Sequence, residues 1–214
     1  MLTRTSFRFS PNGRFAVCLA GEAVGRPKVE RWVLGPAVEV EMLPLEPTGI
    51  HAQPLVRDDG RVVLCQPVDG AHEITGGRQV HRLAVRGLRV VEHPDPAYLA
   101  TAFSVAADGT STVWLVTDSA LRRVVTLPGL LAGGSWLDHN RLGVNQAVGG
   151  VVRAIGIDLT TGSADLLWPD RPSLRLLLAI SPDRAIASRR ISPASGPARP
   201  SSQGPDRPVS GPSA

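Results

Sequence analysis

Short segments in which apolar and polar residues alternate follow one another along most of the chain, and Gly, Pro, Asn or Asp separates them. In Arg4–Asn12, for example, Phe7 and Phe9 alternate with polar residues, and Pro11-Asn12-Gly13 forms a turn signal. A period of two that is interrupted by such turns is typical of strands in antiparallel hairpins. The pattern therefore predicts an all-β protein.

One stretch, Gly134–Pro169, shows the repeating unit most clearly. Its predicted strands are Gly134–Leu137, Arg141–Val148, Val151–Leu159 and Ser163–Trp168. The turns between them are Asp138-His139-Asn140, Gly149-Gly150 and Thr160-Thr161-Gly162. Such a succession predicts a four-stranded antiparallel meander. The apolar face of a single meander needs neighbouring units to cover it.

Other parts of the chain repeat this unit. The first unit has the predicted strands Arg4–Asn12, Arg14–Ala20, Lys28–Leu34 and Ala37–Leu43. The second has Gln53–Val56, Arg61–Gln66, Val80–Val85 and Leu88–Val91. The third has Thr101–Ala106 as its second strand, followed by Thr112–Thr117 and Leu121–Leu127. A fifth begins with Leu174–Ile180 and the turn Ser181-Pro182-Asp183-Arg184, and then stops.

The second strands begin near Arg14, Arg61, Thr101, Arg141 and Arg184, at intervals of 47, 40, 40 and 43 residues. A period of ~40–45 residues with four short strands is typical of β-propeller blades. A β-sandwich would also contain many short strands, but the turn residues recur together with the spacing, which favours the propeller. We expect an all-β, propeller-like array of about four four-stranded antiparallel blades and a partial fifth, in an incomplete ring.

The alignment of units also places the two cysteines. Arg14–Leu19 (R-F-A-V-C-L) aligns with Arg61–Gln66 (R-V-V-L-C-Q), so that Cys18 and Cys65 occupy the same position of adjacent units. Adjacent blades would hold these positions apart, and a disulfide needs Cα atoms within ~7 Å. We therefore expect two free thiols.

Two turns carry a resemblance to a known family. Phe9–Arg14 (F-S-P-N-G-R) and Ile180–Arg184 (I-S-P-D-R), each followed by an apolar strand, resemble the strand-turn-strand signature of WD-like and TolB-like β-propellers. Ala102–Asp118 similarly resembles a hairpin of those blades. The resemblance extends from about Thr3 to Arg190. The second unit has Asp-Asp-Gly without Ser-Pro, and the chain has no Gly-His…Trp-Asp pair, so the WD-repeat family itself is not supported.

The blades are also similar to the N-terminal propeller of prolyl-oligopeptidase-like serine peptidases. In that family a separate α/β-hydrolase domain carries the chemistry, and its mark is a G-x-S-x-G elbow. The nearest string here is Gly133-Gly134-Ser135-Trp136-Leu137, which lacks the closing glycine. The resemblance therefore implies no catalytic residue.

Composition divides the chain into a propeller domain, residues 1–190, and a tail, residues 191–214. The tail is rich in Pro, Ser and Gly, and we expect it to be disordered. The change falls in the middle of a unit, which suggests a truncated or frameshifted form of a longer propeller protein.

Charge and targeting signals narrow the function. The net charge is +4, but most of it lies beyond Ser188, and nucleic-acid binding needs a basic patch on the folded surface. Lys28 is the only lysine among 23 basic residues, which is typical of a GC-rich bacterial genome. We see neither a signal peptide nor an apolar run of membrane-spanning length. We expect a soluble, cytoplasmic protein that binds neither nucleic acid nor membrane.

Candidate chemistry is sparse. Ser135, Asp138 and His139 crowd a single turn, whereas a catalytic triad converges from separate elements. Possible metal ligands are His72, Glu73, His81, His93 and Asp95, without the spacing of a known metal motif. The tryptophans, which are Trp32, Trp114, Trp136 and Trp168, are expected to pack between blades. We therefore assign no catalytic residue, no cofactor and no metal.

Two functions remain open at this stage. The favoured one is a non-enzymatic propeller scaffold or module that binds a protein or peptide. The alternative is the N-terminal propeller of a prolyl-oligopeptidase-like serine hydrolase that lacks its catalytic domain. In either case the open edges of the blades favour self-association, because exposed strand edges template strand addition.

Overall fold

The computed structural model describes residues 2–22, 25–168, 175–180 and 186–190, and the last two ranges as backbone only. These residues form strands, turns and loops, and no helix among them is long and apolar enough to cross a membrane. The predicted all-β class is confirmed. The predicted disordered tail, residues 191–214, lies outside the described residues.

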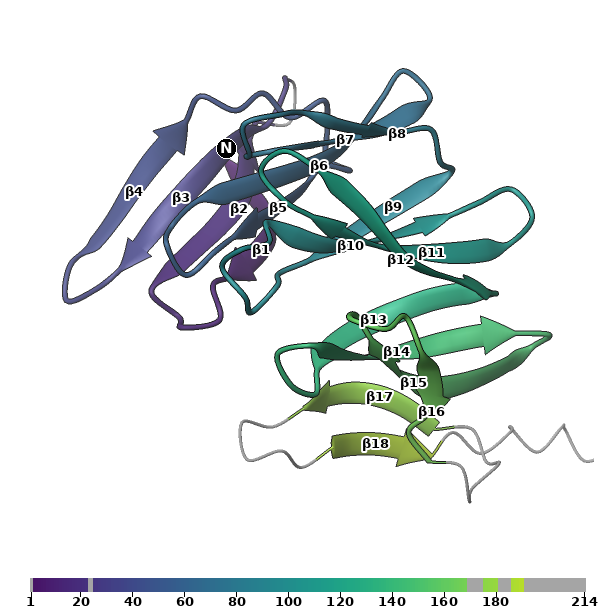
Figure 1. Cartoon of the computed structure of the whole chain (residues 1–214). Coiled ribbons are helices and arrows are strands. Elements are labelled where there is room, and N and C mark those ends of the chain that lie inside the picture. Colours follow the sequence, from purple (N-terminus) through teal and green to yellow (C-terminus); the bar gives the residue numbers. More distant parts are fainter. Residues whose placement is uncertain (1, 23–24, 169–174, 181–185, 191–214) are drawn as a thin grey trace, which may run out of the picture.

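Four sheets have four strands each, and we call them blades 1 to 4 (Figure 1). Blade 1 contains β1 (Thr3–Phe9), β2 (Phe15–Gly21), β3 (Lys28–Leu34) and β4 (Val38–Leu43). Blade 2 contains β5 (Gln53–Val56), β6 (Val62–Val68), β7 (Ala71–Thr75) and β8 (His81–Leu83). Blade 3 contains β9 (Gly87–Val91), β10 (Ala100–Val105), β11 (Thr110–Val116) and β12 (Leu121–Pro128). Blade 4 contains β13 (Leu130–Trp136), β14 (Arg141–Val148), β15 (Val151–Asp158) and β16 (Ala164–Leu166).

Every blade is an antiparallel meander in which each strand pairs with the next one along the chain. A fifth, two-stranded sheet joins β17 (Arg175–Ile180) to β18 (Ile186–Arg190). Tight turns close the hairpins: Gly149 and Gly150, between β14 and β15, both have positive φ, which glycine adopts without a steric penalty. The predicted architecture of four blades and a partial fifth is confirmed.

One boundary predicted from the sequence is wrong. Leu88–Val91 was assigned to the end of the second unit, but these residues belong to β9, the first strand of blade 3. The strand that the pattern missed is β7, Ala71–Thr75. Its sequence, A-H-E-I-T, contains two charged or polar residues between apolar ones and has a weak apolar signal, whereas Leu88–Val91 is strongly apolar.

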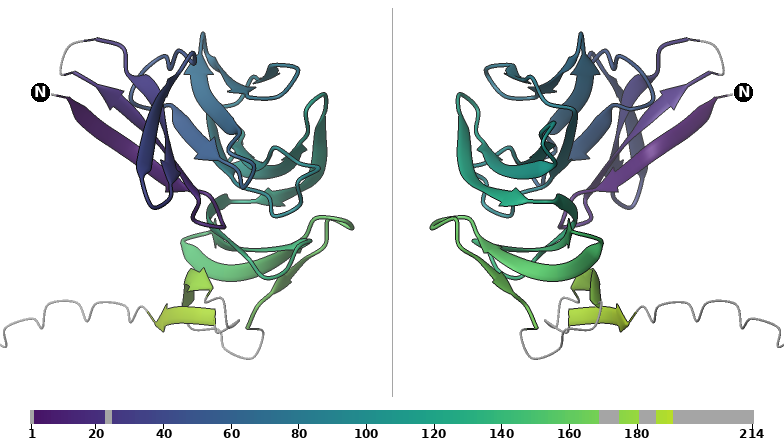
Figure 2. Two further views of the ribbon diagram at one scale, coloured as in Figure 1. Left: turned by 90° about the vertical axis from the view of Figure 1, so that its left-hand side faces the viewer. Right: turned by 90° about the vertical axis from the view of Figure 1, so that its right-hand side faces the viewer.

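The blades follow one another in an open arc (Figures 1 and 2). Consecutive blades are in contact, as between β2 and β5, β6 and β9, β11 and β13, and β15 and β17. The first strand of each blade, which we call its inner strand, lies toward the centre of the arc, because the four inner strands line one common cavity. The inner strand of blade 1 is exposed along its whole length.

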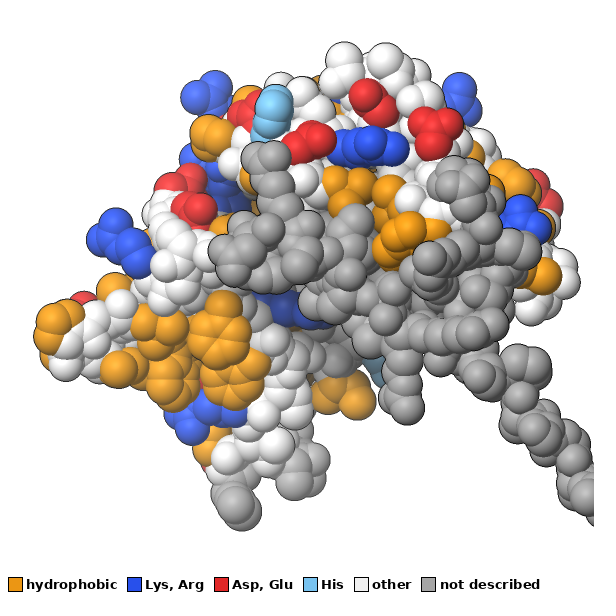
Figure 3. All heavy atoms as spheres, turned by 90° about the horizontal axis from the view of Figure 1, so that it is seen from below, with side chains coloured by type: hydrophobic (Ala, Val, Ile, Leu, Met, Phe, Trp, Pro, Cys, Tyr) orange, Lys and Arg blue, Asp and Glu red, His pale blue; other side chains and the backbone are white. Residues whose placement is uncertain are grey.

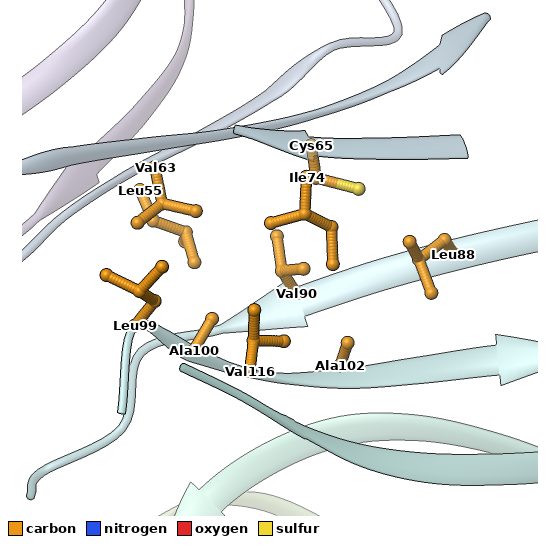
Figure 4. Packing of buried hydrophobic residues seen from close by; sticks show 10 residues of the cluster. All are labelled: Leu55, Val63, Cys65, Ile74, Leu88, Val90, Leu99, Ala100, Ala102 and Val116. Carbon is orange, nitrogen blue, oxygen red and sulfur yellow. The ribbon is translucent and has the colours of Figure 1, made fainter. Parts of the chain in front are cut away.

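Apolar cores lie between the blades rather than within them. The core between blades 1 and 2 includes Val17, Leu19, Val56 and Leu64. Between blades 2 and 3, Leu55, Val63 and Cys65 point toward Val90, Ala100 and Val116 (Figure 4). The core between blades 3 and 4 includes Phe103, Leu115, Leu142 and Ile157. Because a strand points alternate side chains to its two faces, blades 2 and 3 each contribute to the cores on both of their sides.

The two cysteines do not occupy equivalent positions, as the sequence alignment had suggested. In blade 1 the first hairpin closes with the amide of Ser10 donating to the carbonyl of Phe15, whereas in blade 2 the amide of Arg57 donates to that of Arg61. The loop of blade 1 is therefore one residue longer, and this shifts β2 by one position. A one-residue shift reverses the face of every side chain. Leu19, not Cys18, is the structural equivalent of Cys65, and both cysteines are buried free thiols.

Blade 1 has one face that no other blade covers. Strand register places Ala16, Cys18 and Trp32 on this face, in line with Val40 and Met42 of β4. The equivalent face of blades 2, 3 and 4 packs against the preceding blade, through Leu64, Ala102 and Val144 respectively. Phe7, Phe9, Val38, Val40 and Met42 are exposed apolar residues of this blade. Figure 3 shows hydrophobic side chains gathered at the left, on the side of blade 1.

Candidate functional site at the inner strands

A cavity of about 290 Å³ opens where the inner strands of all four blades approach one another. We call it the inner-strand pocket. Its lining residues are Phe7, Arg8 and Phe9 of β1, Leu55 of β5, Arg89, Val90 and Val91 of β9, the adjoining Glu92, and Gly134 and Trp136 of β13. Because these residues come from four blades, the pocket exists only in the assembled arc.

A bulge in β13 shapes the wall of the pocket. The pairing of β13 with β14 shifts register between Ala132 and Ser135, and Gly134 within this bulge has a φ of +135°. A Cβ atom at Gly134 would lie 3.2 Å from Cγ1 of Val91. Glycine therefore allows β13 to pass close to β9, at a backbone conformation that other residues rarely adopt.

Arg8 and Arg89 bring two positive charges to the pocket. In the part of the chain that the structure describes, neither has an ion-pair partner within 4.0 Å. Burial lowers the pKa of Arg89, and the positive charge of Arg8 lowers it further. A half-buried arginine beside a second arginine is unfavourable unless a negative charge compensates, because charge repulsion adds to desolvation.

Glu92 stands next to these arginines, directly after β9. Burial raises its pKa to about 7. The positive charge of Arg8 opposes this rise, and the negative charge of Asp58 adds to it. Near neutral pH the carboxyl group is thus divided between its protonated and ionised forms, and it can donate or accept a hydrogen bond.

Trp136 and His93 form the aromatic side of the site. The indole Nε1–H of Trp136 donates to the backbone carbonyl oxygen of Glu92 at 2.8 Å. The ring of His93 packs on Trp136, with centroids 4.6 Å apart, and on Tyr98, at 4.4 Å. Burial lowers the pKa of His93 to about 4, so the ring is neutral at physiological pH. Its Nδ1 accepts a hydrogen bond from the backbone amide of Asp95.

A second cavity of about 290 Å³ adjoins the first at Glu92 and is lined largely by turn residues such as Pro11, Asp58 and Pro96. Arg57 is buried here and donates to the backbone carbonyl oxygens of Pro96, at 2.8 Å, and Tyr98. These bonds fix the loop between β9 and β10 against blade 2. The two cavities together form a groove along one end of the inner strands.

Ser135, Asp138 and His139 do not form a catalytic triad. Asp138 and His139 are exposed in the turn after β13, and the Asp138 carboxylate accepts a hydrogen bond from the backbone amide of Asn140. Ser135 lies within β13, in the strand that contains the bulge. This arrangement is a turn stabilised by an aspartate, which is common in hairpins.

The five possible metal ligands do not form a metal site either. His81 contacts the carbonyl oxygen of Thr117 through Nε2 at 2.9 Å, and Glu73 pairs with Arg82. His72 lies on β7, while His93 and Asp95 lie in the loop after β9. Within residues 2–22 and 25–168, no group of three or more His, Cys, Asp or Glu side chains is arranged to hold a metal ion.

Arg8, Arg89 and Glu92 are residues that sequence reasoning missed. Each lies at or near the end of an inner strand, just before a turn. This shared place on the inner strands is recognisable only when Leu88–Val91 is assigned to blade 3, and the sequence pattern assigns it to the second unit. Trp136 was expected to pack between blades; it does contact the core between blades 3 and 4, and it also lines the pocket.

No protein-family model matches the chain, and no curated protein does either. Solved structures do resemble it. TolB from Acinetobacter baumannii is 17% identical with a TM-score of 0.59, over 85% of this chain and 47% of that one. The β-propeller domain of the Trilobed protease from Pyrococcus furiosus, which has an open velcro topology, is 11% identical with a TM-score of 0.60, over 84% and 62%.

Oligogalacturonate lyase from Vibrio parahaemolyticus is 12% identical with a TM-score of 0.52, over 86% of this chain and 61% of that one. The chain thus spans about half to two thirds of the length of these structures. At such low identity the similarity concerns the fold alone. The meander blades, the cores between them and the similarity to TolB together identify the fold as a TolB-like β-propeller.

Proposed function

We propose that this chain is a non-enzymatic β-propeller scaffold that binds a segment of a protein or peptide at the inner-strand pocket. The observation that carries the proposal is the convergence of four blades on one cavity that offers aromatic rings beside unpaired charges. Binding pockets combine a largely apolar lining with a few polar groups that fix orientation. Phe9, which is 59% exposed, supplies an apolar anchor at its edge.

Two further observations support a binding role. The adjoining cavity lengthens the pocket into a groove, which suits an extended segment better than a compact small molecule. In addition, Asp138 and His139 lie in an exposed turn after β13, whereas Ser135 lies within that strand, so the three residues do not form a triad. We place this binding module in the cytoplasm, as the sequence suggests, and its two free cysteines are compatible with that location.

Peptide selection tests the proposal directly. Phage display of random twelve-residue peptides against the full chain should yield binders, and the variant Phe9→Ala should weaken them about tenfold, because aromatic anchors contribute most to such interfaces. Val80→Ala is a matched control, since Val80 is 60% exposed and lies outside the pocket. Failure to select a binder, or equal losses in both variants, would contradict the proposal. Turnover of a peptide or ester by the purified chain, abolished by one substitution, would contradict its non-enzymatic part.

The alternative is that the chain is the propeller part of a peptidase-like serine hydrolase. The similarity to the propeller domain of the Trilobed protease favours it, because that domain belongs to a protease and this chain covers 62% of it. The adjoining coding sequence distinguishes the two. Further blades followed by a G-x-S-x-G elbow in a nearby reading frame would support the hydrolase, whereas unrelated sequence would support the scaffold.

We also propose that the uncovered face of blade 1 associates with a second copy of this chain. The support is its equivalence to the faces of blades 2, 3 and 4 that neighbouring blades bury. Contiguous exposed apolar surface of this kind marks an interaction site. The same uncovered face of a second copy can pack against it, so that both copies bury their apolar side chains.

A further inference from the structure

We propose that the inner-strand pocket is a carboxylate site, in which Arg8 and Arg89 together hold one carboxylate group of a bound peptide. The inference rests on the proposed binding function and specifies its ligand as an acidic peptide segment. Three features of the pocket lead to it: the pair of arginines, the charge balance of the lining, and the rings on either side.

The arginines come from different blades but face the same space. Arg8 lies on β1, and strand register pairs it with Val17, whose side chain points into the core between blades 1 and 2. Arg89 lies on β9, the inner strand of blade 3. Each guanidinium presents a planar set of donors that matches the two oxygens of a carboxylate. Both arginines line the same pocket, and the charge of Arg8 lowers the pKa of Arg89, so one anion in the pocket would lie within the field of both.

The charge balance of the lining calls for one negative charge. Among the described residues, the pocket is lined by two positive side chains, Arg8 and Arg89, and by one acidic side chain, Glu92. Asp58, which influences Glu92, lines the adjoining cavity, and its carboxylate accepts a hydrogen bond from the backbone amide of Asn12. With Glu92 ionised the lining has a net charge of one positive unit, and a ligand carboxylate neutralises it.

Glu92 also favours a carboxylate over a phosphate. A phosphate ester carries about two negative charges near neutral pH, and it would be repelled by an ionised Glu92. A carboxylate carries one, which matches the single positive unit of the lining when Glu92 is ionised. The preference therefore holds above about pH 7, the pKa of Glu92, where the ionised form prevails.

The rings beside the arginines indicate that the carboxylate belongs to a larger ligand. Phe7 and Phe9 line one side of the pocket, and Trp136 lines another. An isolated small anion would leave these surfaces in water, whereas the apolar neighbours of an acidic residue in a peptide would cover them. Aromatic side chains of this kind provide much of the affinity of peptide sites.

Matched peptides test the inference. Peptides selected against the full chain are synthesised in pairs that differ only in Glu against Gln, each as a free acid and as a C-terminal amide, and their Kd is measured by calorimetry. We expect a carboxylate to strengthen binding at least tenfold, and the comparison of acid with amide shows whether the side chain or the chain terminus supplies it. Arg8→Gln and Arg89→Gln should each remove that advantage. Arg123→Gln, an exposed arginine of β12 outside the pocket, is the control and should retain it.

A second probe separates this inference from the proposed function. N-acetyl-glutamate α-methylamide, which carries a single carboxylate, is titrated into the full chain while the indole resonance of Trp136 is followed by NMR, with Trp136→Phe used for its assignment. If neutral peptides bind as tightly as acidic ones, the carboxylate site is wrong and the binding function stands. If only N-acetyl-glutamate α-methylamide binds, and the arginine variants abolish it, the carboxylate site stands and the peptide function fails. Absence of binding by every probe overturns both.

Discussion

The indole Nε1–H of Trp136 donates a hydrogen bond to the backbone carbonyl oxygen of Glu92 at 2.8 Å, and this bond joins the inner strands of blades 4 and 3. The bond holds the chain that follows β9 against β13, so that Glu92 stays at the edge of the pocket. The ring of His93 packs against the same indole, at 4.6 Å. Assembly of the pocket and packing between blades therefore depend on the same side chain.

The first prediction concerns this bond. Trp136→Phe keeps an aromatic ring beside His93 but removes the donor, and leaves the carbonyl of Glu92 without this partner. We expect a loss of about 1 kcal/mol in the free energy of unfolding, the usual contribution of one hydrogen bond. Urea denaturation followed by circular dichroism measures it. An unchanged midpoint would show that water replaces the donor without cost.

The second prediction concerns pH. The folded protein retains the proton of Glu92 up to about pH 7, whereas the ordinary pKa of the group is 4.5. Between these values the folded state binds more protons than the unfolded state, so Glu92 lowers stability as the pH rises from about 4.5 to about 7. Glu92→Gln cannot ionise. The variant should melt close to the wild type at pH 4.5 and at a higher temperature at pH 8.

The pH dependence of the wild type alone does not report Glu92, because the titration of His93 changes the stability in the opposite direction. Its pKa falls from 6.5 to about 4, so its contribution to stability grows as the pH rises between these values. Arg8, Asp58 and His93 are present in both proteins, and the difference in Tm isolates Glu92. A difference in Tm that does not change with pH would mean that Glu92 titrates at its ordinary value.

The third prediction concerns the uncovered face of blade 1. Light scattering on the wild type should give an apparent mass that rises with concentration, because this face buries its apolar side chains only against another chain. Val40→Lys places a charge in β4 on that face and should lower the apparent mass. Val80→Lys adds the same charge outside the face and should leave it unchanged. A monodisperse monomer at all concentrations would contradict the proposed self-association.

The fourth prediction uses a pair of glycines with the same backbone conformation. Gly109 and Gly129 have φ values of +80° and +79°. A Cβ atom at Gly109 meets nothing within 4 Å, whereas one at Gly129 would lie 2.0 Å from the carbonyl oxygen of Ala147. Gly109→Ala should cost about 1 kcal/mol from backbone strain alone, and Gly129→Ala roughly 3 kcal/mol because overlap is added.

Chemical denaturation of both variants measures the difference. Gly129 connects β12 to β13, and thus blade 3 to blade 4, at a point where the chain passes close to β14. Similar losses in the two variants would show that the chain at Gly129 is loosely packed against β14. A larger loss at Gly129 would confirm that the link between the blades is closely packed.

The sequence by itself determined most of the strands and the repeat of four-stranded units, although it missed β7 and assigned Leu88–Val91 to the wrong blade. Alternating residues such as Phe7 and Phe9, and turns such as Gly149-Gly150, act locally, since the period of a strand and the φ of a glycine depend on a few neighbouring residues. The repeat of these local signals at about 40 residues was enough to predict blades, because each meander must cover its apolar face with the next.

Only the tertiary structure decided which face each residue occupies and which residues meet. The single additional loop residue before Phe15 reverses the faces of β2, so Cys18 and Cys65 are not equivalent although their sequences align. Arg8 and Arg89 are more than 80 residues apart in the chain and share a pocket only because the inner strands converge. The strand period and the turn residues are local properties of the chain. The register between strands and the approach of the inner strands depend on contacts between distant segments, so the alternation of apolar and polar residues does not reveal them.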